Sequence, residues 1–144
     1  MTARKWRGPA VVDTDVFSSE LVPGSVLAER YRPLTLARPT FISFQTAAEI
    51  RFGALLRGWG EARRLRMEAW LAVAEMVESG PELIAVYAQL KVDCHRAGHP
   101  LGQKIHDGDR WIAATAIRLD LPLVANDGIF ADVPRLRLET LREK

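Results

Sequence analysis

Residues 109–116 read Asp-Arg-Trp-Ile-Ala-Ala-Thr-Ala, and this stretch decides the fold more than any other part of the chain. Alanine is the strongest helix former and small side chains allow close packing, so we predict a closely packed helix here. Asp109 is a natural N-cap for that helix. Residues 121–125 follow as a predicted strand, which ends before Asn126-Asp127-Gly128, a turn pattern.

The same alternation of apolar runs and helical patterns extends toward the N-terminus. Two β-rich runs predict strands at residues 10–12 and 41–44, and a short last strand is expected at 136–138. Helical spacing predicts the remaining helices, which are expected at residues 25–31, 46–59, 61–79 and 82–96. Strands that alternate with helices favour an α/β fold with a mainly parallel sheet.

The composition fits one compact domain over residues 1–144. Apolar residues make up 48% of the chain and charged residues 26%, which is the balance of a soluble globular protein. No run approaches the ~20 apolar residues of a membrane span, so we expect a cytoplasmic protein with no membrane contact. The net charge of +2 is too small to identify a nucleic-acid partner, although basic residues cluster at 4–7 and 63–66.

Four carboxylates occupy similar places in this pattern. Asp13 and Asp127 each follow a predicted strand, whereas Glu49 and Asp109 lie at the starts of predicted helices. In an open parallel sheet, ligand sites form beyond the carboxyl ends of the strands, so the four side chains can converge in one cleft. Each of them also has a purely structural interpretation, as a turn residue after a strand or as part of a helix cap.

A cluster of carboxylates would need a cation. Carboxylates within a few ångströms repel one another, and some would take up protons unless a positive charge held them ionised. An all-oxygen ligand set suits a hard ion such as Mg²⁺ or Mn²⁺. Such an ion can activate water for attack on a phosphodiester and neutralise charge on the phosphoryl oxygens.

The four carboxylates lie in motifs that resemble those of PIN domains. Residues 11–15 (VVDTD) resemble the opening of the family, a strand that ends in Asp followed by Thr or Ser. Residues 46–55 (TAAEIRFGAL) resemble its second motif and residues 109–116 its third, which is the most specific. Residues 123–130 (LVANDGIF) resemble the fourth. All four motifs occur in the order of the family.

The resemblance implies a PIN-like α/β fold, with a twisted, mainly parallel sheet flanked by helices. It further implies a Mg²⁺-dependent endoribonuclease, with Mn²⁺ as an alternative ion. The catalytic and metal-binding residues would be Asp13, Glu49, Asp109 and Asp127. Asp13 and Asp109 would be the firmest ligands, and Thr14 would lie beside the metal. Among PIN domains the chain is most similar to VapC toxins, which implies an RNA substrate, a homodimer and inhibition by a VapB-type antitoxin.

The chain departs from the family pattern at several places. Residues 1–9 form a longer and basic N-terminal segment, and residues 101–108 form a long loop. Asp15 stands where Asn or Ser is common, which adds negative charge near the site, and Ala125 replaces a frequent Thr. Asp107 is either a fifth ligand or a solvated loop residue.

Other functions stay open on the sequence alone. A phosphoacceptor signalling module also places Asp at strand ends with Mg²⁺, but it would need a late Lys where this chain has Asp127. A non-catalytic PIN-like module that binds RNA or protein normally lacks part of the acidic quartet. A DNA-directed metal-dependent nuclease would use the same metal site, so only the resemblance favours RNA. The loop residue His106 is either an RNA contact or a residue without a role.

Overall fold

The computed structural model describes residues 7–143, in which five parallel strands form one sheet in the order β3-β2-β1-β4-β5. The strands are β1 (Ala10–Val12), β2 (Thr40–Ser43), β3 (Glu75–Val77), β4 (Leu123–Val124) and β5 (Leu138–Glu139). Every residue of the central strand β1 is buried, because helices cover both faces of the sheet. The register pairs Val11 with Phe41 of β2 and with Leu123 of β4, so the carboxyl ends of these strands lie side by side.

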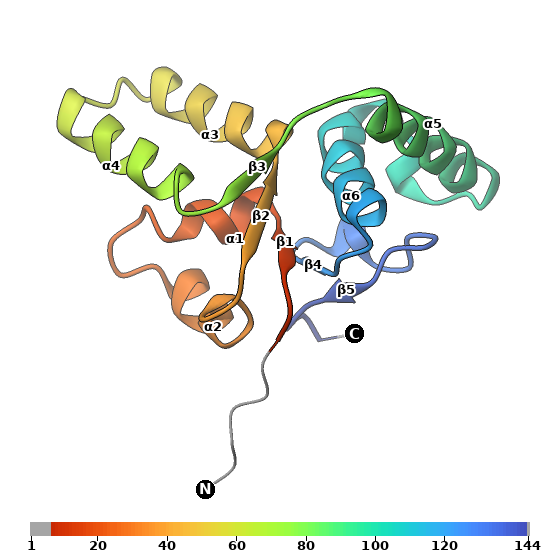
Figure 1. The fold of residues 1–144 in the computed structure, drawn as a ribbon, viewed down its shortest axis with the longest axis horizontal. Coiled ribbons are helices and arrows are strands. Elements are labelled where there is room, and N and C mark those ends of the chain that lie inside the picture. The colour runs from red at the N-terminus through yellow and green to blue at the C-terminus, as the bar shows by residue number, and fades with distance from the viewer. Residues whose placement is uncertain (1–6, 144) are drawn as a thin grey trace, which may run out of the picture.

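Helices cover the two faces unequally, with α1 to α4 on one side of the sheet and α5 and α6 on the other (Figure 1). The helices are α1 (Thr14–Ser19), α2 (Val26–Thr35), α3 (Phe44–Leu56), α4 (Glu61–Leu71), α5 (Pro81–Arg96) and α6 (Asp107–Leu119). Short 3-10 helices occur at η1 (Pro100–Gly102), η2 (Lys104–His106) and η3 (Gly128–Phe130). The core consists of two buried apolar clusters, one on each face of the sheet. Alternate residues of β1 contribute to them, since Val12 faces the α1–α4 side and Val11 the α5–α6 side. The predicted α/β fold with a parallel sheet is confirmed.

Strand β3 is absent from the sequence prediction, which continued a helix through residue 79. The helix α4 ends at Leu71, and residues 75–77 pair instead with β2 at the edge of the sheet. Val73 and Met76 fit the spacing of a helix but are 65% and 41% exposed, so they do not form the buried face that this spacing predicted. Pairing with a neighbouring strand decides the conformation of this short segment.

The starts of two helices also differ from the prediction. Helix α3 begins at Phe44, and its cap is Ser43, whose Oγ accepts a hydrogen bond from the Gln45 amide at 3.1 Å. The interpretation of Glu49 as part of the cap of a helix that starts near Thr46 is therefore wrong. Helix α6 begins at Asp107, so Asp109 is not its N-cap but a residue of its first turn, and the loop predicted at residues 101–108 is largely helical.

The remaining elements agree with the prediction apart from their ends. Helix α2 continues to Thr35, beyond the predicted end at residue 31, and includes Pro33. Strands β4 and β5 contain two residues each. No helix within residues 7–143 combines the length and apolar character that a membrane span requires. Most of the basic N-terminal segment, including Arg4 and Lys5, lies outside the described residues.

Candidate active site

Asp13 lies directly beyond the carboxyl end of the central strand and is almost completely buried. Its Oδ1 accepts a hydrogen bond from the Val16 amide at 3.0 Å, which caps α1. Its own amide donates to the carbonyl of Val124 at 3.0 Å, so the end of β1 is fixed against the end of β4. The structural role anticipated for Asp13 is therefore real, and it coexists with a position at the expected ligand edge of the sheet.

Asp127 follows the neighbouring strand β4 and begins the short helix η3. Its Oδ1 accepts a hydrogen bond from the Ile129 amide at 3.0 Å. This local bond matches the turn role predicted from Asp127-Gly128. The strand pairing of β1 with β4 brings Asp127 and Asp13 to the same edge of the sheet.

Glu49 and Asp109 come from helices that approach each other very closely at Gly108. A Cβ atom at Gly108 would lie 2.9 Å from Glu49 Oε1 and 2.9 Å from Gln45 Nε2, so the first turn of α6 rests directly on these side chains of α3. Gln45 Nε2 also donates to Glu49 Oε1 at 2.9 Å and orients that carboxylate. The close approach explains how residues distant in sequence reach one site.

Contacts made by His106, Thr46 and Gln45 support the site, and the sequence indicated no role for Thr46 or Gln45. His106 Nδ1 lies 3.1 Å from Asp109 Oδ2. Thr14 donates to the buried hydroxyl of Thr46 at 3.0 Å, which joins the start of α1 to the start of α3. Gln45 stands four residues before Glu49, and His106 three before Asp109, so helical spacing was the available signal.

The carboxylates act on one another electrostatically. The pKa of Asp13 is raised from 3.8 to about 7, chiefly by burial and in addition by the charges of Asp15, Asp127 and Asp109, while the hydrogen bond from the Val16 amide lowers it. Burial also raises the pKa of Asp109, with added contributions from Asp127 and Glu49, while the hydrogen bond with His106 lowers it. The structure therefore brings all four predicted site residues into one electrostatic cluster.

Asp15 belongs to the same cluster. Burial raises the pKa of its carboxyl, and the charges of Asp127 and Glu49 raise it further. The extra negative charge expected from Asp15 is therefore present next to the quartet. It increases the need of the cluster for a cation.

The donor set suits a hard divalent ion. Within residues 7–143, no three His, Cys, Asp or Glu side chains stand close enough together to ligate one ion by themselves. Mg²⁺ does not require such a cage, because it commonly binds one or two carboxylates and keeps several waters. The Asp13 carboxylate is buried, lies near other carboxylates and has a raised pKa. A bound cation would stabilise its ionised form.

Asp107 has a structural role, which corrects its interpretation as a solvated loop residue. It accepts hydrogen bonds from Arg110 Nη2 at 2.9 Å and from the hydroxyl of Tyr87. Arg110 is completely buried and also donates to the carbonyls of Leu101 and Gln103, both at 2.7 Å. This buried arginine ties η1 and η2 to the start of α6, where Asp109 and His106 lie.

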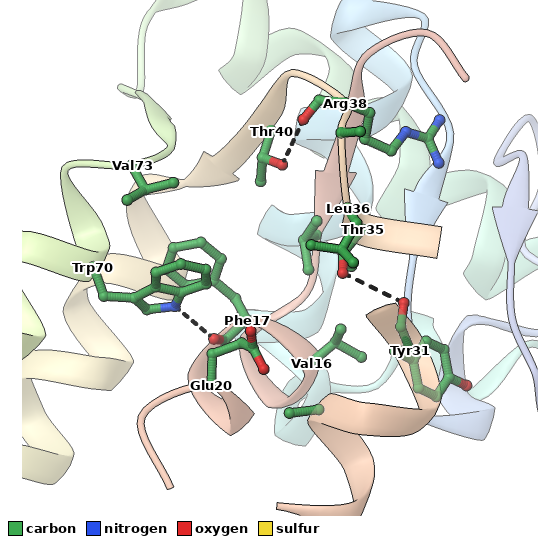
Figure 2. A pocket seen from close by; sticks show the side chains of 13 residues that line it. Val16, Phe17, Glu20, Tyr31, Thr35, Leu36, Arg38, Thr40, Trp70 and Val73 are labelled. Carbon is green, nitrogen blue, oxygen red and sulfur yellow. Dashed lines mark hydrogen bonds between the residues drawn. The ribbon is translucent and has the colours of Figure 1, made fainter. Parts of the chain in front are cut away.

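A partly open pocket lies apart from the carboxylates. It has a volume of about 270 Å³ and is lined by residues of α1, α2, β1, β2 and α4. Figure 2 shows Trp70 and Phe17 on one side of it and Tyr31 on the other, and the two stacked rings of the first pair are 5.0 Å apart. None of the four site carboxylates lines this pocket, so it is not the place where metal chemistry would occur.

Comparisons with solved structures identify the same fold in VapBC complexes and in FitAcB. VapBC2 from Rickettsia felis, bound to a promoter DNA fragment, gives a TM-score of 0.75 at 20% identity, covering 92% of this chain and 98% of that chain. FitAcB from Neisseria gonorrhoeae gives 0.72 at 25% identity, with coverage of 90% and 95%. DNA-bound VapBC from Salmonella typhimurium gives 0.70 at 24% identity, with coverage of 93% and 98%.

The family assignment follows from the sequence match together with the fold. No curated protein matches the chain in sequence. The model of the PIN domain family matches residues 10–136, which contain every strand but the last and all four site carboxylates. The chain therefore belongs to the PIN domain family.

Proposed function

We propose that the protein is a metal-dependent endoribonuclease and the toxin of a type II toxin–antitoxin pair. The observation that carries the proposal is the buried Asp13 carboxylate, whose neighbours Asp15, Asp109 and Asp127 all raise its pKa. Such a cluster is costly without a cation, and a cation held by carboxylates is suited to phosphodiester hydrolysis. The catalytic and metal-binding residues are Asp13, Glu49, Asp109 and Asp127.

The chain's own side chains would hold and orient the metal ligands. Asp13 is fixed by its bond to the Val16 amide, Glu49 by Gln45, and Asp109 by His106. A bound Mg²⁺ or Mn²⁺ would supply the positive charge that activates water and neutralises the phosphate. The close packing of α3 and α6 at Gly108 keeps the two helix-borne carboxylates in place relative to the strand ends.

The likeness to toxin–antitoxin complexes supports the biological role. The solved VapBC structures from Rickettsia felis and Salmonella typhimurium are complexes bound to DNA, and each is covered over nearly its whole chain by this protein. We infer that this chain is likewise a VapC-type toxin, that residues 1–144 are one PIN domain, and that a VapB-type antitoxin inhibits it. RNA as the substrate rests on the resemblance to VapC toxins.

A homodimer is part of the same proposal. Helix α3 carries Phe52, Leu55 and Leu56 at 64%, 71% and 72% exposure, and contiguous exposed apolar side chains are typical of association surfaces. Sedimentation equilibrium of the purified toxin would give the mass of a dimer. A monomer at every concentration would contradict this part of the proposal without affecting the nuclease assignment.

The decisive experiment is cleavage of RNA by purified, antitoxin-free protein. Wild-type protein is compared with Asp109→Asn and with Asp120→Asn, a control whose side chain is 96% exposed at the end of α6. Each is incubated with RNA and with single-stranded DNA, in Mg²⁺, in Mn²⁺ and in chelator. We expect RNA cleavage that requires metal, is lost in Asp109→Asn and is retained in Asp120→Asn.

The other outcomes separate the alternatives. Cleavage of DNA in preference to RNA would identify a DNA-directed nuclease with the same metal site. Binding of RNA without cleavage, by protein that also binds metal, would favour the non-catalytic binding module. Equal cleavage by wild type and Asp109→Asn would remove the acidic quartet from the mechanism.

A further inference from the structure

The segment after β5 brings an arginine to the edge of the carboxylate cluster. A Cβ atom at Gly128 would lie 3.0 Å from Nη2 and 3.1 Å from Cζ of Arg142, so this guanidinium lies directly against the Gly128 backbone. Gly128 follows Asp127, whose charge acts on both Asp13 and Asp109. Arg142 comes after the last of the four motifs, and no motif includes it.

Helix α2 fixes the backbone immediately before Arg142. The amide of Leu141 donates to the hydroxyl of Tyr31 at 3.0 Å, and the carbonyl of Leu141 accepts from the guanidinium of Arg30. The amide of Arg142 itself donates to Thr140 Oγ1 at 3.2 Å. Both the amide and the carbonyl of Leu141 are therefore hydrogen-bonded to α2, and this fixes the backbone from which the Arg142 side chain extends.

The charge of Arg142 is not used within the described part of the chain. Most arginines in residues 7–143 that carry ion pairs lie away from the cluster, for example Arg51 with Glu68 and Arg118 with Glu82. The Arg142 guanidinium makes no ion pair or side-chain hydrogen bond with residues 7–143, and the residue is exposed. A guanidinium with open donors, in contact with solvent, is a bidentate site for a phosphate or carboxylate.

We propose that Arg142 binds a phosphate of the RNA substrate adjacent to the one that is cleaved. This inference rests on the proposed function. A carboxylate cluster repels a polyanion, and the metal compensates this only at the reacting phosphate. The Arg142 guanidinium, which lies against Gly128 next to Asp127, offsets this repulsion at the neighbouring phosphate and fixes the position of the RNA strand. Arg142 is accordingly a substrate-binding residue and takes no part in proton transfer.

Binding of RNA tests the proposal independently of cleavage. Affinity for a labelled single-stranded RNA is measured by fluorescence anisotropy in chelator over a range of salt concentrations, for wild type, Arg142→Gln, Arg142→Lys and the control Arg118→Gln. Arg142→Gln should weaken binding and reduce the slope of log affinity against log salt by about 0.7, the loss of one phosphate contact. Arg142→Lys should keep the slope, and Arg118→Gln should match wild type.

Kinetics in Mg²⁺ give the second readout. Arg142→Gln should raise KM roughly tenfold and leave kcat nearly unchanged, because the contact is made equally in the bound substrate and in the transition state. A fall in kcat at constant KM would instead assign Arg142 to the reacting phosphate and overturn the proposed role.

Gly128 provides a matched test of geometry. All three atoms nearest to a Cβ at this position belong to the Arg142 guanidinium, so Gly128→Ala should displace it and reproduce part of the Arg142→Gln defect. In the Arg142→Gln background, Gly128→Ala should then have little further effect. Fully additive defects would show that the two residues act separately and would overturn the placement.

The outcomes distinguish this inference from the proposed function. Wild-type protein that binds RNA without cutting it would remove only the nuclease assignment, and the salt slopes would still decide the role of Arg142. Cleavage by wild type with an unchanged salt slope and KM in Arg142→Gln would remove only the role of Arg142. Wild-type protein that neither binds RNA in chelator nor cleaves it in Mg²⁺ would contradict both.

Discussion

At the scale of single residues, Asp13 combines two requirements that oppose each other. As the N-cap of α1 it stabilises the fold, but as a buried carboxylate beside three others it destabilises the ion-free protein. Asparagine would keep the hydrogen bond to the Val16 amide and remove the charge. The fold and the charge at this position can therefore be separated by one substitution.

We predict that Asp13→Asn stabilises the metal-free protein. In wild type, the folded state retains the Asp13 proton from pH 3.8 up to about 7, whereas the unfolded state has lost it, so stability falls as the pH rises through this window. The shift corresponds to at most about 4 kcal/mol above pH 7. Thermal unfolding in chelator should therefore show a gain for Asp13→Asn that is larger at about pH 8 than at about pH 5.

Asp120→Asn serves as the control for that measurement, because the Asp120 side chain is almost fully exposed. It should show no gain that depends on pH. A gain of the same size in both variants, or one that is equal at both pH values, would contradict the assignment of a raised pKa to Asp13.

At the scale of elements, the contact between α3 and α6 should be more important for activity than for stability. In Gly108→Ala, the added Cβ would meet only the ends of the Gln45 and Glu49 side chains among its nearest neighbours, and these can move. We expect a loss of cleavage of roughly tenfold or more, since small displacements of catalytic groups are costly, with little change in melting temperature. Gly60→Ala, where a Cβ would meet nothing within 4 Å, should leave cleavage unchanged.

The buried Arg110, in contrast to Gly108, should be important chiefly for stability. Replacing it with Met leaves the carbonyls of Leu101 and Gln103 and the carboxylate of Asp107 without their donor. We predict a loss of about 3 kcal/mol in urea unfolding, and faster hydrogen exchange in residues 100–106. Arg118→Met removes a partly exposed ion pair with Glu82 and should cost less than about 1 kcal/mol.

The same scale shows which elements the sequence could predict. Strand β1 was found because it is an unbroken apolar run, all of which is buried, and α6 because alanine favours a closely packed helix. Helix α5 was found because its apolar residues recur at helical spacing. Strand β3 was missed because it is a three-residue edge strand that exists only through pairing with β2. The start of α3 was misplaced because Ser43, the last residue of β2, is also the cap of the next helix.

For the site, the sequence could supply the four carboxylates but not their supports. Asp13 and Asp127 were visible as residues that follow strands, Glu49 and Asp109 as residues at the starts of helices, and the family motifs joined the four into one site. The contact of Gly108 with Gln45, and that of Gly128 with Arg142, depend on how separate elements pack. No local pattern encodes such contacts, so they became apparent only in the folded chain.

At the scale of the whole molecule, metal binding and folding should be linked. An ion that binds only the folded cluster stabilises the protein by mass action, by about 2.7 kcal/mol at one hundred times its dissociation constant. We therefore expect Mg²⁺ or Mn²⁺ to raise the melting temperature of wild type and to have a much smaller effect on Asp13→Asn. An equal rise in both proteins would show that the ion binds elsewhere.

The order of the strands has a consequence for synthesis of the protein. Strand β1 is made first among the strands, yet one of its two neighbours is β4, which is made only after residue 122. A growing chain on the ribosome therefore holds Asp13 before Asp109 and Asp127 have been made. The carboxylate cluster cannot assemble until β4 and the residues that follow it have left the ribosome, so we expect a chain that stops short of β4 to have no nuclease activity.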